Sequence, residues 1–314
     1  MNQDQASHKV SVVINCHNGD SYLEEAIMSV YAQDFTSWEL VLLDNASSDG
    51  TRDIAQKFDE KLRYFYNKEL LPLGAARNLA VAQCSGEYIA FLDSDDLWLP
   101  QKLSKQLERI ESFPPEDRYG FCYTGATRIS HSGEDIISFF KERKTIEGEA
   151  LLELMKDCFI PLSSCLIKRE LYYESGRINE ELNQVEEWDL WLRLAKHYKL
   201  AYVDQELTKI RFHSNNLSKD YRAQKEEMYF VLNSQVLGKE FESCRKNALK
   251  VLDIRFQIID FLLAPRSGVF KKIYSLILLL LKCLRSPISA FQILKTYLSL
   301  DLIKFFYIKY LKKY

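Results

Sequence analysis

Apolar runs and amphipathic segments alternate along the first 110 residues of the chain. Short runs rich in β-branched residues predict buried strands at 9–15, 39–44, 62–66 and 87–92. Apolar residues that recur at helical spacing between these runs predict helices at 21–31, 51–58 and 74–84. Strands that alternate with helices favour a parallel sheet with helices on both faces, so we expect an α/β fold.

Two polar positions predict the starts of helices. Ser21 and Glu24 have the spacing of a capping box, in which side chains bond the unpaired N–H groups at a helix start. Asp96 precedes an amphipathic segment at 97–110, and we expect it to cap that helix. A further amphipathic helix is predicted at 186–198.

Polar residues follow the predicted strands at the points where the strands end. Asn18 comes after the first strand, Asp44 ends the second, and Asp93–Asp96 follow the fourth. Because open α/β sheets bind ligands beyond the carboxyl ends of their strands, these residues predict an acidic cleft. The chain has no G-x-G-x-x-G after the first strand and no G-x-x-x-x-G-K-[ST], which argues against dinucleotide enzymes and P-loop NTPases.

Asp93 and Asp95 flank a single residue at the mouth of the fourth strand. Residues two apart in an extended segment point the same way, so both carboxylates can approach one cation. Mg²⁺ and Mn²⁺ need only one or two carboxylates when phosphates and waters complete their ligand shell. A cation held in this way would neutralise charge on a departing diphosphate. The alternative is an Asx turn with no metal role, and the two residues alone leave both interpretations open.

A second acidic cluster, Glu186-Glu187-Trp188-Asp189, opens the last of the predicted helices. Glu187 starts the stripe of apolar residues on that helix, so we expect its carboxyl group to face inward. Burial raises the pKa of a carboxyl group toward values that suit a general base. A favourable interaction with the helix dipole is the alternative. Asp189 lies four residues before Arg193, a spacing that a salt bridge explains.

Composition is that of an ordinary globular protein, but the charge is distributed unevenly. The 314 residues are 47% apolar and carry a formal charge of −2. Residues 266–314 hold ten Lys and Arg against one acid, Asp301, so the preceding chain is acidic. The seven cysteines are scattered without C-x-x-C pairs, which favours reduced thiols over disulfides or a structural zinc site. The first ten residues lack the basic and apolar regions of a secretory signal, so none is expected.

The basic tail, residues 264–314, is rich in leucine and isoleucine. Its uncharged core, 273–281, has only nine residues, which is too short to cross a bilayer. Apolar segments broken by lysine and arginine suit helices that lie on an anionic membrane surface. A helical cap or a dimer face is the alternative, and the apolar character argues against nucleic acid as a partner. We expect a catalytic domain at 1–220 and a helical C-terminal region at 221–314.

Five segments occur in order between Val10 and Ser218: VSVVINCHNGDSYLEEAIMSVYAQ, LVLLDNASSDGT, LGAARNLAVAQCSGEYIAFLDSDDLW, EEWDLWLRLA and IRFHSNNLS. Together they resemble the family 2 glycosyltransferases, which have the GT-A fold and include many bacterial polysaccharide and lipopolysaccharide enzymes. The resemblance implies a mostly parallel mixed sheet flanked by helices, with a C-terminal helical tail. It also implies an inverting transferase, in which a base deprotonates an acceptor hydroxyl that attacks the anomeric carbon opposite the diphosphate.

The resemblance implies a set of residues that bind the nucleotide-sugar donor. Asp44 would contact the nucleotide base, and the edge around Asn15 and Asn18 would line the same pocket. Arg77 matches a stretch near the diphosphate, and Ser94 lies between the two aspartates that follow the fourth strand.

The resemblance also implies a metal site and a base. Asp95 would bind Mn²⁺ or Mg²⁺ directly, Asp93 would touch the ribose or the metal, and His213 joins the metal or diphosphate contacts in some relatives. Glu187 occupies the position of the base, where the family more often has Asp. Two neighbouring acids are the alternatives for that role: Glu186 and Asp189.

The implied partners are a nucleotide-diphosphate sugar, expected to be a UDP-sugar, and a glycan or lipid-linked acceptor. Many relatives work at the cytoplasmic face of the membrane, so we expect a cytoplasmic protein that its basic tail holds at the inner face. A nucleotidyltransferase would carry a Gly-rich loop with Arg and Lys after the first strand, which CHNGDSYLEE lacks. A non-catalytic nucleotide-sugar-binding relative, anchored at the membrane, stays open because residue 187 is Glu.

Overall fold

The chain divides into two units, Met1–Glu227 and Met228–Tyr314. The computed structural model describes residues 8–138, 145–213, 221–234 and 241–263. The first unit contains the sheet and the helices around it. The described part of the second unit consists of the rest of α8 (Tyr221–Ser234) and α9 (Glu242–Leu263). The basic tail, 264–314, lies outside the described residues.

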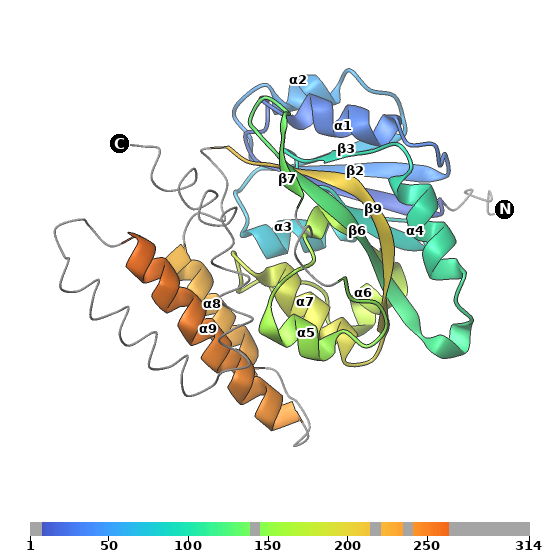
Figure 1. The fold of residues 1–314 in the computed structure, drawn as a ribbon. Helices are drawn as coiled ribbons and strands as arrows, with labels where there is room; N and C mark the ends of the chain where they lie inside the picture. Colours follow the sequence, from blue (N-terminus) through green and yellow to red (C-terminus); the bar gives the residue numbers. More distant parts are fainter. Residues whose placement is uncertain (1–7, 139–144, 214–220, 235–240, 264–314) are drawn as a thin grey trace. The chain divides into compact units, whose positions relative to one another are not determined.

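The strands predicted from the apolar runs form the parallel half of one mixed sheet (Figure 1). In order across the sheet they are β3 (Leu62–Asn67), β2 (Trp38–Asn45), β1 (Val10–Cys16) and β4 (Tyr88–Phe91). Every residue of β2 is buried, and so is every residue of β1 except Asn15, as expected for strands covered on both faces. Cys16 pairs in register with Asp44, so β1 and β2 end at the same level. The predicted parallel sheet is confirmed.

The other half of the sheet is mixed. It continues from β4 through β8 (Cys165–Lys168), β6 (Tyr119–Ile129), β9 (Lys199–Arg211) and β5 (Leu97–Trp98), with β7 (Asp135–Ser138) paired to β6. β8 runs antiparallel to both of its neighbours, whereas β6 and β9 are parallel. β9 brings its last residues to the edge of the sheet where the predicted site lies.

Helices cover both faces of the sheet. The described helices of the first unit, besides the start of α8, are α1 (Leu23–Tyr31), α2 (Thr51–Ala55), α3 (Leu73–Val81), α4 (Lys102–Glu111), α5 (Leu151–Lys156), α6 (Arg169–Glu174) and α7 (Glu186–Ala195). Short 3₁₀ turns lie at Pro115–Asp117 and Leu162–Ser164. Figure 1 shows α1 and α2 on one side of the parallel strands and α3 on the other.

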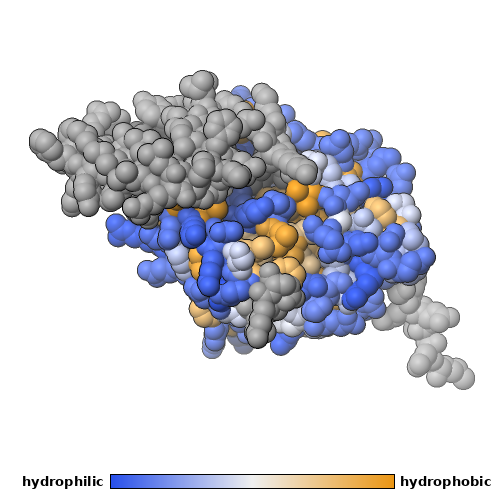
Figure 2. All heavy atoms as spheres, turned by 60° about the horizontal axis from the view of Figure 1, so that its bottom comes forward, coloured by the Kyte–Doolittle hydropathy of each residue, from blue (hydrophilic) through white to orange (hydrophobic). Residues whose placement is uncertain are grey.

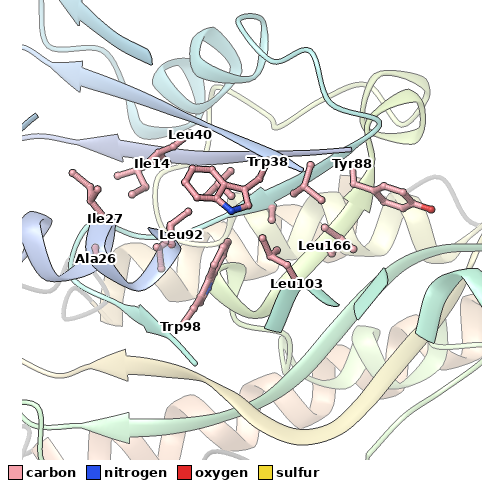
Figure 3. Close-up of a cluster of buried hydrophobic side chains, with 14 of the residues drawn as sticks. Ile14, Ala26, Ile27, Trp38, Leu40, Tyr88, Leu92, Trp98, Leu103 and Leu166 are labelled. Atoms are coloured by element: carbon pink, nitrogen blue, oxygen red, sulfur yellow. The ribbon is translucent and has the colours of Figure 1, made fainter. Parts of the chain in front are cut away.

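The core on the α1 side follows from the alternation of side chains along β1. Val10, Val12 and Ile14 belong to one buried cluster with residues of α1, α2 and α4, because alternate side chains of a strand point to the same face. Figure 3 shows this cluster, in which Trp38 and Trp98 lie among smaller aliphatic side chains. Buried thiols contribute to the interior as well: Cys16, Cys84, Cys122 and Cys165.

Two predicted helix starts are wrong. α1 begins after Tyr22 without a side-chain cap, and Ser21 donates its hydroxyl hydrogen to Asp20 Oδ1 instead. Residues 97–98 form β5, so the next helix, α4, begins only at Lys102. Asp96 caps no helix because its carboxylate is buried and bonded to distant parts of the chain, which override the local preference.

Among the described residues, no helix combines the length and the apolar character that crossing a membrane requires. On the face shown in Figure 2, hydrophilic side chains cover most of the described surface, and apolar side chains gather near its centre.

Candidate functional site

The ends of β1 and β2 form one wall of the site. Asp44 is buried, and its carboxylate accepts hydrogen bonds from the Ser47 backbone N–H at 2.8 Å and from the Tyr64 hydroxyl at 2.6 Å. Asn15 lies one residue before the end of β1, and its Oδ1 is buried without a hydrogen-bond partner among the described residues. A buried amide oxygen that lacks a donor is costly, so this atom suits an N–H or O–H group of a ligand.

Asn18 ties the loop after β1 to the loop after β2. Its φ of +53° lies in the left-handed region, which asparagine tolerates better than most residues. Its backbone N–H donates to Ser47 Oγ at 2.9 Å, and its Oδ1 accepts the Ser48 N–H at 2.9 Å. The predicted donor-binding residue therefore also has a structural role at this edge.

The acidic loop, Asp93–Asp96, follows β4 and is held by Ser163 and Arg211. The Asp93 N–H donates to Ser163 Oγ at 3.1 Å, and the Ser163 hydroxyl donates to Asp96 Oδ2 at 2.6 Å. Asp96 Oδ1 accepts the Arg211 backbone N–H at 2.9 Å. Burial and the neighbouring charges of Asp95 and Asp93 raise the pKa of Asp96 well above its ordinary value.

Two carboxylates of the acidic loop remain partly exposed, with 41% of the Asp93 side chain and 24% of the Asp95 side chain accessible. Asp95 Oδ2 lies 2.7 Å from Nε2 of His213, and the ring of Tyr22 lies 5.0 Å from the imidazole. Ser94 hydrogen-bonds the thiol of Cys16 at the end of β1. The loop after β4 and the segment after β9 therefore meet beside the end of β1.

Asp95 and His213, two of the residues that we expect to hold a divalent cation, lie side by side. Within the described ranges, no group of three or more His, Cys, Asp or Glu side chains could hold a metal ion. Mg²⁺ and Mn²⁺ do not require such a group when phosphates and waters supply the remaining ligands. Asp95 and His213 together offer one carboxylate oxygen and one imidazole nitrogen, which lie 2.7 Å apart.

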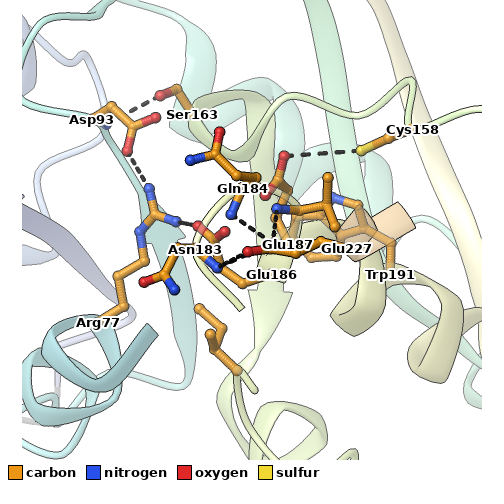
Figure 4. A network of polar contacts seen from close by, with 12 residues as sticks. Arg77, Asp93, Cys158, Ser163, Asn183, Gln184, Glu186, Glu187, Trp191 and Glu227 are labelled. Atoms are coloured by element: carbon orange, nitrogen blue, oxygen red, sulfur yellow. Dashed lines mark hydrogen bonds and ion pairs between the residues drawn. The ribbon is translucent and has the colours of Figure 1, made fainter. Parts of the chain in front are cut away.

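Arg77, on α3, joins the acidic loop to the second acidic cluster (Figure 4). Its guanidinium is buried, donates from Nη2 to Asp93 Oδ1 at 2.7 Å and forms an ion pair through Nη1 with Glu186. Burial alone would lower the pKa of Arg77, but the carboxylates of Asp93, Glu186 and Glu187 raise it above the ordinary value. Arg77 therefore stays charged and lies between two groups of acids.

The second acidic cluster begins α7, and its two glutamates differ in their partners. Glu186 pairs with Arg77 through Oε1, whereas its Oε2 is buried without a hydrogen-bond partner in the described part of the chain. Burial and the negative charge of Glu186 raise the pKa of Glu187 to about 8, although Arg77 opposes the shift. The thiol of Cys158 lies 3.9 Å from Glu187 Oε1. A carboxyl group with this pKa suits a general base near neutral pH.

The third acid of the cluster, Asp189, is buried and bonded within α7. Its Oδ2 accepts hydrogen bonds from Nε and Nη2 of Arg193 at 2.9 and 2.7 Å, which confirms the predicted pair four residues apart. Trp188 and Trp191 are fully buried and donate their indole N–H groups to the carbonyls of Leu154 and Ile160. These contacts fix α7 against α5 and the segment that follows it.

Sequence reasoning missed the two residues that hold the acidic loop. Ser163 and Arg211 bond Asp96 from 67 and 115 positions away. No local pattern marks Ser163. Arg211 stands two residues before His213, within one of the segments that carried the resemblance. This position in the sequence was the one available indication of a role for Arg211.

Comparisons with known proteins indicate a single family. The sequence profile described as Glycosyl transferase family 2 matches residues 11–175, more than half of the chain. TuaG of Bacillus subtilis, a putative teichuronic acid biosynthesis glycosyltransferase, is 31% identical over 227 residues, which cover 71% of this chain and 86% of TuaG. WfgD of Escherichia coli, a UDP-Glc:alpha-D-GlcNAc-diphosphoundecaprenol beta-1,3-glucosyltransferase, is 28% identical over 196 residues, covering 62% of this chain and 73% of WfgD.

Solved structures share the fold. The fragment 1–349 of S. aureus TarS, in complex with UDP-GlcNAc, has a TM-score of 0.62 at 17% identity, covering 87% of this chain and 81% of the fragment. The mannosyltransferase PcManGT of Pyrobaculum calidifontis, in complex with GDP-Man and Mn²⁺, has a TM-score of 0.58 at 15% identity, covering 98% and 88%. The predicted fold class is confirmed.

Proposed function

The chain belongs to glycosyl transferase family 2, and from this premise we propose that it is a metal-dependent, inverting enzyme that uses a UDP-sugar. The acceptor is a hydroxyl group of a glycan or of a lipid-linked sugar, in the synthesis of a surface polysaccharide. The observation that carries the proposal is the bridge through Arg77, which joins Asp93 on the donor side to the glutamates of α7. Donor binding and base chemistry meet in this one buried network.

A UDP-sugar as donor is supported by the site and by relatives. The name of WfgD includes UDP-Glc, and the TarS fragment was solved with UDP-GlcNAc. Uracil offers an imide N–H group, which the unpartnered Oδ1 of Asn15 can accept. Asp44 is fixed on the neighbouring strand by Ser47 and Tyr64, so its carboxylate is already oriented when the nucleotide arrives.

Asp95 and His213 would hold the cation, Mn²⁺ or Mg²⁺, with Asp93 beside it. The presence of Mn²⁺ in the PcManGT complex supports this assignment. When bound, the cation would neutralise the negative charge that develops on the leaving diphosphate. Arg77 fixes one oxygen of Asp93, and Arg211 donates from Nε to the Asp95 carbonyl at 2.9 Å, so the loop carrying the ligands is held in place.

Glu187 is the proposed base. The acceptor hydroxyl gives its proton to Glu187 while its oxygen bonds to the anomeric carbon, and the bond from that carbon to the diphosphate breaks with release of UDP. Glu186 is bound to Arg77 and Asp189 to Arg193, whereas Oε1 of Glu187 lies 3.9 Å from the weakly polar thiol of Cys158. Glu187 therefore has the carboxylate best placed to take a proton.

The names of relatives and the charge of the basic tail support the proposed acceptor and location. TuaG is named for teichuronic acid biosynthesis, and the name of WfgD specifies a diphosphoundecaprenol-linked sugar as acceptor. A lipid-linked acceptor would place the enzyme at the inner face of the cytoplasmic membrane. Ten basic residues beyond position 265 suit that anionic surface.

Thermal unfolding with UDP, with and without MnCl₂, tests the donor and metal sites together. A ligand that binds only the folded state raises its stability by about 2.7 kcal/mol at a hundredfold excess over Kd. We expect UDP to raise Tm by a few degrees when Mn²⁺ is present, and Asp95→Ala to remove the part that depends on Mn²⁺. Asp53→Ala, which removes an exposed aspartate on α2, is the matched control.

If UDP does not change Tm, the proposed donor site is contradicted. The alternative of a non-catalytic protein that binds a nucleotide sugar would then lack support as well. A shift with GDP alone would change the class of donor. An Asp95→Ala variant with an undiminished Mn²⁺ effect would remove Asp95 from the metal site.

A further inference from the structure

The start of α7 is held by a carboxylate that comes from another helix. α7 has no side-chain cap of its own, since its N-cap residue is Val185. Glu227, on the part of α8 that belongs to the first unit, accepts hydrogen bonds from the backbone N–H groups of Asn183, Gln184 and Val185 at 3.0, 2.8 and 3.2 Å (Figure 4). These three peptide groups directly precede the glutamates of the second acidic cluster.

One carboxylate that binds three successive N–H groups fixes the chain more tightly than a single contact does. Hydrogen bonds to a charged acceptor are stronger than those between neutral groups. A negative charge near the first turn also interacts favourably with the helix dipole. The contact therefore determines where α7 begins and how its first turn is oriented.

We propose that Glu227 is a positioning residue of the transferase, which holds the first turn of α7 so that Glu187 faces the donor. The proposal rests on the proposed function, because it assigns Glu227 to the base named there. Val185 joins the anchored segment directly to Glu186, so displacement of the segment displaces both glutamates. The site then extends to residue 227, past the segments that carried the resemblance, which end at Ser218.

The charges around Glu187 make its position measurable. Four groups face it from different elements: Glu186 on α7, Arg77 on α3, Asp93 after β4 and Cys158 after α5. Burial is the largest cause of its raised pKa. If the first turn of α7 loosens, the carboxyl group gains water and its pKa falls toward the ordinary value.

Hydrogen exchange of the full-length protein tests the anchor without any substrate. In Glu227→Ala we expect the amides of 183–189 to exchange at least tenfold faster than in the wild type. Glu226→Ala, which removes the exposed neighbouring glutamate on α8, should leave them unchanged. Unchanged exchange in Glu227→Ala would overturn the proposal. If Glu227→Ala does not fold, amide exchange of residues 183–189 is compared between the wild type and Glu227→Gln, which keeps an acceptor oxygen.

The pH dependence of turnover tests the positioning of the base. UDP release from UDP-glucose and UDP-GlcNAc, with water as acceptor and MnCl₂ present, gives kcat for each variant. In Glu227→Ala we expect kcat to fall at least tenfold at pH 8.5 and KM for the UDP-sugar to stay within twofold. The acidic limb of the profile of kcat against pH should move to lower pH by one unit or more. Glu227→Gln should fall between this variant and the wild type.

The outcomes separate the two proposals. If kcat falls by the same factor at every pH and the acidic limb of the profile does not move, Glu227 has a merely structural role. This result would overturn the proposal that Glu227 positions the base. A wild type that releases no UDP from either sugar would contradict the proposed function instead, and the exchange rates would then decide whether Glu227 anchors α7.

Discussion

Arg77 shows how individual residues set the chemistry of the site. One buried guanidinium faces the carboxylates of Asp93, Glu186 and Glu187, so the acids outnumber the cation that compensates them. Burial raises the pKa of each of these three carboxyl groups, and Arg77 limits the rise without cancelling it. The pKa of about 8 for Glu187 is the result. A carboxylate that would be too weak a base in water can therefore accept a proton near neutral pH.

We predict that turnover rises with pH and reaches half of its maximum near pH 8. Only the deprotonated form of Glu187 can accept the proton, so kcat should fall about tenfold for each pH unit below that value. Glu187→Gln should lower kcat by about 10²–10⁴-fold and leave UDP binding intact. The check is UDP release from UDP-sugars between pH 6 and 9.5. A flat profile in the wild type would contradict the assignment.

Local patterns predicted the acids of the site but not the cations and hydroxyls that hold them. Asp93 and Asp95 became candidates through their spacing after a strand, and Glu187 through its place in the apolar stripe of a helix, although each pattern alone left a structural interpretation open. The partners that organise them, Ser163 and Arg211, lie 67 and 115 positions from Asp96. Side-chain pairs at such separations depend on the register of the sheet, which no local pattern contains.

At the scale of elements, the four parallel strands were predictable, whereas the starts of α1 and α4 were not. Continuous apolar runs identified β1, β2 and β4 because strands that are buried on both faces consist mostly of apolar residues, whereas β3, at the edge of the sheet, is only partly buried. α4 begins at Lys102, after the short β5, and not at residue 97. Lys102 is completely buried, donates from Nζ to Gln106 Oε1 at 2.7 Å and lies over the ring of Trp98. Burial lowers its pKa to about 7.

We predict that Lys102 makes the folded state more stable as the pH rises from 7 to 9. The unfolded chain keeps this lysine protonated up to about pH 10.5, whereas the folded chain releases the proton above about pH 7. The unfolded state therefore binds more protons in this window, and stability gains up to about 1.4 kcal/mol per pH unit. Urea unfolding of the wild type and of Lys102→Met measures the difference.

The slope is the informative quantity in that comparison. Lys102→Met also leaves Gln106 Oε1 without its donor, which shifts stability by a constant amount at every pH. Equal slopes in the two proteins would show that Lys102 stays charged in the folded state.

At the scale of the whole molecule, the chain combines an acidic catalytic unit with a basic tail. The described helices include none that could cross a membrane, and the tail itself lies outside the described residues. The ten basic residues beyond position 265 are each worth about 1 kcal/mol near an anionic leaflet. Attachment would therefore depend on many weak contacts and on salt.

We predict that the full chain sediments with vesicles containing phosphatidylglycerol and that a chain ending at Leu263 does not. Salt at 0.5 M should release most of the full chain, because screening shortens the reach of surface charges. Vesicles of phosphatidylcholine alone are the control for charge. Equal sedimentation of both chains would assign membrane binding to another surface.

The Arg77 bridge sets the order in which parts of the site appear while the protein is being synthesised. It joins residues 109 positions apart, and β4 is complete roughly 100 residues before the glutamates of α7 are added. At about 5–20 residues per second, the ribosome takes roughly 5–20 s to cover that distance. During this interval the nascent chain holds Arg77 with Asp93 but without Glu186, and the acidic loop lacks the proposed base. A nascent chain that stops short of α7 cannot carry out the transfer, whatever it binds.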